Sequence, residues 1–118
     1  MMNWTENEYD SNGNMTKIIA YNSDGTMMYW AEDEYDLHEN RTKGIFYNSD
    51  DSINYWHEYE HDSYGNRTKK IYYNPDGSIS RFEQTEYDSL GNKIKEIYYK
   101  SDGSINYWHA YEYIDFDE

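Results

Sequence analysis

The chain has 118 residues, a formal net charge of −14 and no cysteine. A negative field of this size repels nucleic acid and anionic membranes, so we expect neither as a partner, and without thiols there are no disulfides or thiolate metal sites. The low hydropathy is typical of disorder, but 19% of the residues are aromatic, and Tyr and Trp bury large areas while a polar end stays in water. We therefore predict one folded domain with a thin core.

The first residues, Met1–Glu6, lack the basic region and apolar run of a signal peptide. No apolar stretch approaches the roughly 20 residues needed to span a bilayer. We therefore expect a soluble chain, and the residues themselves leave its localisation open.

The sequence repeats itself every 26 residues, as the spacing of Glu8, Glu34, Glu60, Glu86 and Glu112 shows. A fixed period of this length is the signature of a repeat architecture. We divide residues 1–118, as a single repeat domain, into four full units (8–33, 34–59, 60–85 and 86–111) with partial units at both ends.

Each unit carries two turn signals about 13 residues apart. In the first unit these are the segments 10–13, with the sequence Asp-Ser-Asn-Gly, and 22–25, with the sequence Asn-Ser-Asp-Gly. Both fit a hairpin loop with a left-handed residue at the Gly position. The second unit has Glu39 and Asp51 at these positions. If these turns keep φ above zero, each should cost roughly 1 kcal/mol, so we predict that this unit is the looser one.

Between the turns lie segments of seven to ten residues rich in Tyr, Ile, Thr and Trp. Pro occurs only in a turn, and helical periodicity is absent. These segments predict an all-β fold of antiparallel β-hairpin repeats, with about nine strands in an elongated meander sheet or an open coil.

Strict alternation from the Asn22 turn assigns the two faces of this sheet. If Asn22 pairs with Thr26, then Ile19, Tyr21 and Tyr29 share one face, and Trp30 and its repeats lie on the other. We predict that the Ile/Tyr face is the core and that the Trp face meets solvent or ligand. A shift of one residue would exchange these faces.

The segment Tyr-Asp-x-x-Gly-Asn recurs at 9–14, 87–92 and, with His61 in place of Tyr, at 61–66; Tyr35-Asp36 begins a fourth copy. This pattern resembles the YD repeats of bacterial Rhs-type and related cell-surface proteins. The resemblance implies extended β-sheet scaffolds without catalysis, a secreted or cell-surface location, and carbohydrate binding. The Tyr-Tyr-x-x-Asp-Gly-Ser segments also resemble, less closely, choline- and glucan-binding cell-wall repeats.

The Trp series is the main candidate for a binding site. With two strands per unit, equivalent Trp residues lie about 9.6 Å apart, close to a disaccharide step of an extended glycan. We predict a glycan track formed by these aromatic side chains and neighbouring amides: Trp4, Trp30, Trp56, Trp108, Tyr72, Tyr98, Asn54 and Asn106. The competing interpretation is that each Trp packs across strands against Tyr72, Tyr98 or Phe46.

Other chemistry has weaker support. His57 and His61 are about 13 Å apart along a strand, too far to share a metal, and we expect the His side chains to be exposed. The Asp-rich turns could hold Ca²⁺, but turn geometry already explains those residues, so we predict no cofactor or metal. No nucleophile–base pair or distinct carboxylate pair stands out. We predict that the protein is not an enzyme.

The sequence thus favours a non-catalytic bacterial surface or structural module that binds an extended carbohydrate. An alternative is an acidic protein-interaction module, for example one that neutralises a basic toxin or partner, whose binding would fall steeply with salt. A third is a self-assembling β scaffold, a homo-oligomer formed through sheet faces or edges.

Overall fold

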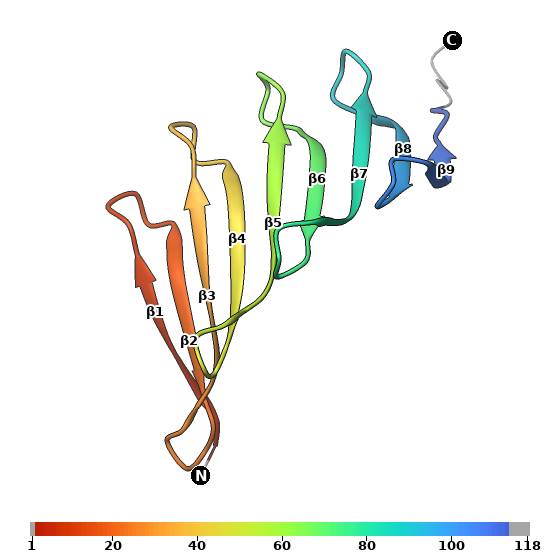
Figure 1. Ribbon diagram of the computed structural model, residues 1–118. Coiled ribbons are helices and arrows are strands. Elements are labelled where there is room, and N and C mark those ends of the chain that lie inside the picture. Colours follow the sequence, from red (N-terminus) through yellow and green to blue (C-terminus); the bar gives the residue numbers. More distant parts are fainter. Residues whose placement is uncertain (1, 114–118) are drawn as a thin grey trace.

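The computed structural model describes residues 2–113, and this part of the chain forms nine strands and no helix. The strands are β1 (Trp4–Tyr9), β2 (Met15–Tyr21), β3 (Met27–Tyr35), β4 (Arg41–Asn48), β5 (Ile53–His61), β6 (Arg67–Tyr73), β7 (Ile79–Tyr87), β8 (Lys93–Lys100) and β9 (Ile105–Ala110). They form one antiparallel sheet in the order of the sequence, which confirms the predicted all-β meander (Figure 1).

The sheet is elongated and strongly twisted, with extents of 62 × 35 × 29 Å. The strand directions turn steadily from β1 to β9, as expected from the twist between neighbouring strands. In the described residues, no helix is long and apolar enough to cross a membrane. The end of the partial unit that begins at Glu112 lies outside the described residues.

All hairpin turns close with the same two backbone hydrogen bonds. At the β2–β3 turn, Asn22 N–H donates to Thr26 O (2.8 Å) and Gly25 N–H donates to Asn22 O (3.0 Å). Gly25 has φ of 92°, in the left-handed region. Glu39 (φ 67°) and Asp51 (φ 71°) adopt the same conformation without the freedom of Gly, which is the condition on which the predicted cost depends.

The turn Asp residues hold these loops by accepting hydrogen bonds. Asp10 Oδ1 accepts from the backbone N–H groups of Asn12 and Asn14, both at 2.9 Å. In the other turn type, Asp24 Oδ1 accepts from Thr26 N–H (3.0 Å) and from the Thr26 hydroxyl (2.6 Å). These bonds explain why Asp recurs at fixed offsets in every unit.

Every hairpin also contains a β-bulge on the strand that follows the turn. Between β2 and β3, Tyr21 pairs with Met27 but Ala20 pairs with Tyr29, so Met28 is an extra residue. The same irregularity occurs in all eight hairpins, three positions after the left-handed residue; the extra residues are Thr16, Met28, Thr42, Asn54, Thr68, Ser80, Ile94 and Asn106.

These bulges overturn the predicted division of the faces. Each extra residue reverses the alternation of side chains, so Ile19 pairs with Trp30 rather than with Tyr29. One face, which we call the Trp face, carries Trp30 and Glu32 together with Ile19. The opposite face, the His face, carries Ala20, Tyr29 and Ala31, together with their repeats, including His57.

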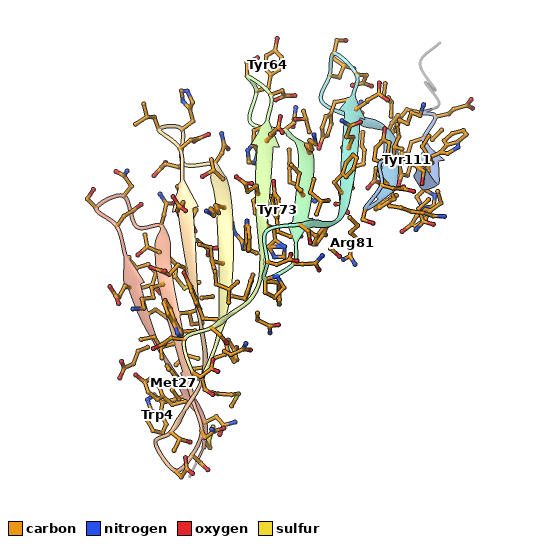
Figure 2. All side chains as sticks on the ribbon, in the orientation of Figure 1. Trp4, Met27, Tyr64, Tyr73, Arg81 and Tyr111 are labelled. Carbon is orange, nitrogen blue, oxygen red and sulfur yellow. The ribbon has the colours of Figure 1, made fainter. Side chains whose placement is uncertain are left out.

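The sheet is a single layer whose side chains project from both sides (Figure 2). Ala20, Ala31 and Tyr59 are the buried hydrophobic residues in the described part, and all lie on the His face. Ile19 and Tyr21, predicted as core, are half-buried on the Trp face. Both faces therefore meet water, and cross-strand side-chain pairs supply the packing.

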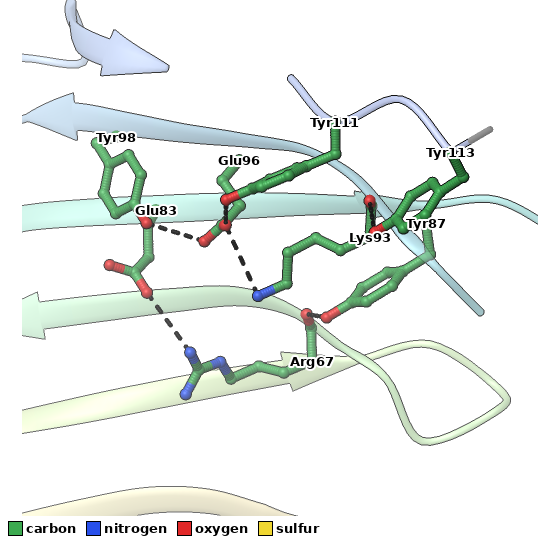
Figure 3. Close-up of polar contacts among 8 residues, drawn as sticks. All are labelled: Arg67, Glu83, Tyr87, Lys93, Glu96, Tyr98, Tyr111 and Tyr113. Atoms are coloured by element: carbon green, nitrogen blue, oxygen red, sulfur yellow. Dashed lines mark hydrogen bonds and ion pairs between the residues drawn. The ribbon is translucent and has the colours of Figure 1, made fainter. Parts of the chain in front are cut away.

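Tyr side chains join the open ends of several hairpins. The Tyr35 hydroxyl donates to Met15 O (2.9 Å), and the Tyr87 hydroxyl donates to Arg67 O (2.7 Å). Tyr113 repeats the contact with Lys93 O at 2.6 Å (Figure 3). His61 stands at the equivalent position of β5, so the hairpin β4–β5 lacks this Tyr bond.

Candidate binding face

The aromatic rings of the Trp face stack on one another across the strands. Trp30 stacks on Tyr47 with ring centroids 3.8 Å apart and an interplanar angle of 6°. The Lys17 ammonium, from the strand on the other side of β3, lies 4.8 Å from the Trp30 ring centroid. Because neighbours on both sides cover this ring, it presents its edge to solvent.

The same stacking recurs along the sheet. Trp4 stacks on Tyr21 (5.2 Å), and Trp56 stacks on Tyr73 (5.0 Å). Trp4, Trp30 and Trp56 therefore pack across strands, but the predicted partners Tyr72, Tyr98 and Phe46 lie on the opposite face. Trp108 on β9 remains 55% exposed.

Two of the indole rings also contact the turn of the next hairpin: Trp30 contacts the β4–β5 turn and Trp56 the β6–β7 turn. Trp30 Nε1–H donates to Asp51 Oδ1 at 2.9 Å. The tip of the Trp56 ring lies 3.8 Å from where a Cβ at Gly77 would stand. In the described residues, the Trp side chains from Trp4 to Trp56 thus brace the sheet, and their ring faces offer little room for a sugar.

A second aromatic row crosses the His face from β3 to β9. Its members come from successive strands: Tyr29, Phe46, Tyr55, Tyr72, Arg81, Tyr98 and Tyr107. Neighbours form pairs: the ring centroids are 4.5 Å apart in Phe46–Tyr55 and in Tyr98–Tyr107. In the middle pair the Arg81 guanidinium lies 4.1 Å from the Tyr72 ring centroid.

Three hollows lie between successive members of this row, one for each unit crossed. The first (about 430 Å³) is lined by Tyr29, Phe46 and Tyr55. The second (about 350 Å³) lies between Tyr55 and Tyr72, beside Arg81. The third, of about 670 Å³, is lined by Arg81, Tyr98 and Tyr107.

The bulge residues form part of the walls of these hollows. Asn54 lines the first, Ser80 the second and third, and Asn106 the third. The structure therefore brings together the predicted residues Tyr72, Tyr98, Asn54 and Asn106 along one row, and places the predicted Trp residues on the other face. Two further hollows, of about 700 and 540 Å³, lie between neighbouring turns at the other end of the strands.

His57 lies at the centre of the His face and contradicts the expectation of an exposed imidazole. It is 8% exposed and surrounded by the rings of Phe46, Tyr55 and Tyr72, with centroids 5.1–5.4 Å away. Burial, reinforced by Lys70 and three Arg side chains, lowers its pKa from 6.5 to about 4. The imidazole is therefore neutral at pH 7.

Gly44 is the sequence signal that could have revealed this burial. It pairs with His57 across β4 and β5, where other units have Ile18, Lys70 or Glu96. A Cβ at Gly44 would stand 2.5 Å from an Arg41 guanidinium nitrogen, so the missing side chain admits that group. Arg41 Nε lies 2.9 Å from Asp33 Oδ1.

A polar network covers the His face between β6 and β9 (Figure 3). Glu96 accepts from the hydroxyls of Tyr98 (2.8 Å) and Tyr111 (2.5 Å) and pairs with Lys93 (3.7 Å). The Tyr111 hydroxyl holds the pKa of Glu96 below its usual range, and the bond to Glu96 raises the pKa of Tyr98. Hydrogen bonds and an ion pair therefore hold the Glu96 carboxylate in place.

The turns offer no preformed metal cage within residues 2–113. No group of three or more His, Asp or Glu side chains there is placed to hold a metal ion. The oxygens of Asp10 and Asp24 already accept hydrogen bonds from their own turns.

The fold and this face define a single-layer β-hairpin repeat protein with an aromatic row on one side. Residues 4–43 match the family described as a protein of unknown function (DUF2963). The match runs from β1 into β4. A comparison with curated proteins gives no match.

Proposed function

We propose that this chain is a non-catalytic repeat module that binds an extended carbohydrate along the aromatic row of its His face. The observation that carries this proposal is the recurrence of an aromatic hollow with every unit crossed. Hollows two strands apart repeat at about 9.6 Å, so a linear polymer with a regular step can meet the same contacts several times.

The chemistry of the row suits sugars. Tyr rings combine an apolar surface with a hydroxyl, as sugar rings combine C–H and O–H groups. Tyr29, Tyr55 and Tyr107 are each about 40–50% exposed and accessible to a ligand. The Asn54 and Asn106 amides and the Ser80 hydroxyl supply donors and acceptors beside them.

The resemblance to YD repeats supports a place for this module at a bacterial surface. The extended single-layer sheet fits a scaffold that presents one long face to a polymer.

Binding to a panel of soluble glycans by affinity electrophoresis tests the proposal. Removing one ring contact by Tyr55→Ala or Tyr107→Ala should weaken binding by up to about tenfold. Tyr64→Ala is the matched control, because Tyr64 stands 89% exposed at the tip of the β5–β6 turn, away from the row (Figure 2).

Two outcomes contradict this function. One is the absence of binding to every glycan class. The other is equal loss of binding in the Tyr55→Ala and Tyr64→Ala variants.

The excess negative charge supports a second candidate, the capture of a basic protein. On the Trp face Glu34 and Glu60 stand opposite Lys43 and Lys69 in the strand register. All Lys and Arg residues lie in strands, so the excess negative charge lies mainly in the turns. Turn Asp residues such as Asp50 and Asp76 follow the end of the sheet in a row. Polylysine binding that falls steeply with salt and with Asp50→Asn/Asp76→Asn, but not with Tyr55→Ala, would favour this candidate.

A further inference from the structure

Four of the ten Lys and Arg side chains gather at the centre of the His face. Arg41, Arg67 and Lys70 lie 5.0, 5.6 and 5.4 Å from the Tyr59 ring centroid. Lys70 and Arg81 lie 4.5 and 4.1 Å from the Tyr72 ring centroid. The chain has a net charge of −14, so this cluster is a locally positive region on a negatively charged protein.

The acids on this face neutralise only part of the cluster. Asp33 pairs with Arg41, and Glu83 pairs with Arg67 at 3.6 Å. Lys70 and Arg81 form no ion pair with any described residue. Arg81 lines the second hollow, and Lys70 lies beside the Tyr72 ring, opposite Glu83 in the register of β6 and β7.

His57 lines the same hollow. Its Nδ1 is buried and forms no hydrogen bond with residues 2–113. A buried polar group without a partner costs free energy, and this imidazole therefore sits in a poorly solvated environment. His57 and Arg81 both line the hollow between Tyr55 and Tyr72.

We propose that this hollow is an oxyanion subsite, which takes a carboxylate or sulfate group carried by an acidic glycan. The Arg81 guanidinium can bind such a group through two parallel N–H bonds, and Lys70 adds a second charge. His57 lines the hollow beside Arg81, so an anion bound there lies close to its imidazole. The choice of glycan rests on the proposed function, whereas the anion site itself needs only the groups named here.

Binding should be coupled to protonation of His57. The cations that lower the pKa of this imidazole are Arg41 from β4, Arg67 and Lys70 from β6, and Arg81 from β7. The acids on the same face are Asp33 from β3, paired with Arg41, and Glu83 from β7, paired with Arg67. A bound anion opposes their effect and raises the pKa of His57. Anion affinity should therefore increase as the pH falls from 7 towards 5.

His109 provides an internal control for this coupling. It occupies the equivalent position two units further along the chain. Its ring centroid lies 6.0 Å from that of Tyr98 and 5.6 Å from that of Tyr107. Its surroundings contain Glu96 instead of a cation cluster, and it is exposed. It should not respond to an anion in the second hollow.

The test follows the imidazole NMR signals during titration at constant ionic strength. The probes are sodium sulfate, a uronic acid oligosaccharide and the neutral oligosaccharide of the same length. We expect sulfate to shift the signals of His57 but not those of His109. The acidic oligosaccharide should bind at least tenfold more tightly than the neutral one, and Arg81→Gln should remove that advantage.

Lys43→Gln is the matched control, because it removes one positive charge from the Trp face. Equal effects of Arg81→Gln and Lys43→Gln, or an unresponsive His57, would overturn the subsite. Neutral glycan binding without a sulfate response leaves the proposed function standing and the subsite wrong. A sulfate response without binding of any glycan supports the anion site and contradicts the proposed glycan-binding function.

Discussion

The left-handed residues of the second unit carry a cost that can be measured. Glu39 has φ of 67° where other units have Gly, and a non-Gly residue there costs roughly 1 kcal/mol. We predict that Glu39→Gly stabilises the protein by about 1 kcal/mol, measured by urea unfolding. Asp51→Gly should gain less, because it removes the 2.9 Å hydrogen bond from Trp30, whereas Glu39 accepts only a long bond of 3.4 Å from Asn14. Equal gains at both positions would contradict this role of Asp51.

The titratable residues predict loss of stability in two separate pH ranges. The folded pKa of His57 is lowered to about 4 from 6.5, so the unfolded chain binds more protons between these values and stability falls as the pH drops through them. Hydrogen bonds from Asn14 and Thr26 lower the pKa of Asp10 and Asp24 from 3.8. Their contribution is present above that value and is lost below it.

Urea unfolding at a series of pH values measures both ranges. His57→Gln should flatten the curve between pH 6.5 and 4 and leave the loss below 3.8 intact. An unchanged upper range in this variant would show that His57 does not titrate as a buried group.

At the scale of the element, the Tyr bonds at the open hairpin ends predict uneven stability. Tyr87→Phe removes the bond to Arg67 O and should cost about 0.5–1.5 kcal/mol. His61→Tyr should restore the missing bond in hairpin β4–β5 and slow hydrogen exchange at that end. Tyr64→Phe, which alters an exposed turn tip, serves as the control and should change neither quantity.

The elements also show how far the sequence could predict this protein. The period, turn residues and alternating segments suffice for the strands, their order and the positive φ of Glu39 and Asp51. The bulges were missed because the turn motif fixes only the first pair after the turn, Tyr21 with Met27. The consecutive apolar residues Met27 and Met28 were the available signal.

The candidate site was only partly predictable for the same reason. One reversed alternation moves Trp30 to the face of Ile19 and separates it from Tyr72. The cluster around His57 depends on side chains from three neighbouring strands. The repeat pattern does not predict this cluster, because Arg81 and Lys70 differ from the residues at the equivalent positions of the other units.

At the scale of the whole molecule, charge opposes association through the open edges. β1 and β9 each have one neighbour in the sheet, so their outer backbone groups can pair with another chain. We predict a monomer at low salt and growing self-association at about 1 M salt, where the Debye length falls to about 3 Å. Light scattering measures this, and Ile105→Lys on β9 should suppress it; constant size at all salt concentrations would contradict edge pairing.

Because the order of the strands in the sheet is that of the sequence, the molecule has a distinctive mechanical geometry. The first and last strands, β1 and β9, form opposite edges of the sheet (Figure 1). A pulling force applied between β1 and β9 acts across the strands. It loads the hydrogen bonds of an edge strand pair first and those of the next pair afterwards. The sheet should therefore unfold one hairpin at a time at low force. Under tension the chain lengthens in steps of a single unit while the remaining units stay folded.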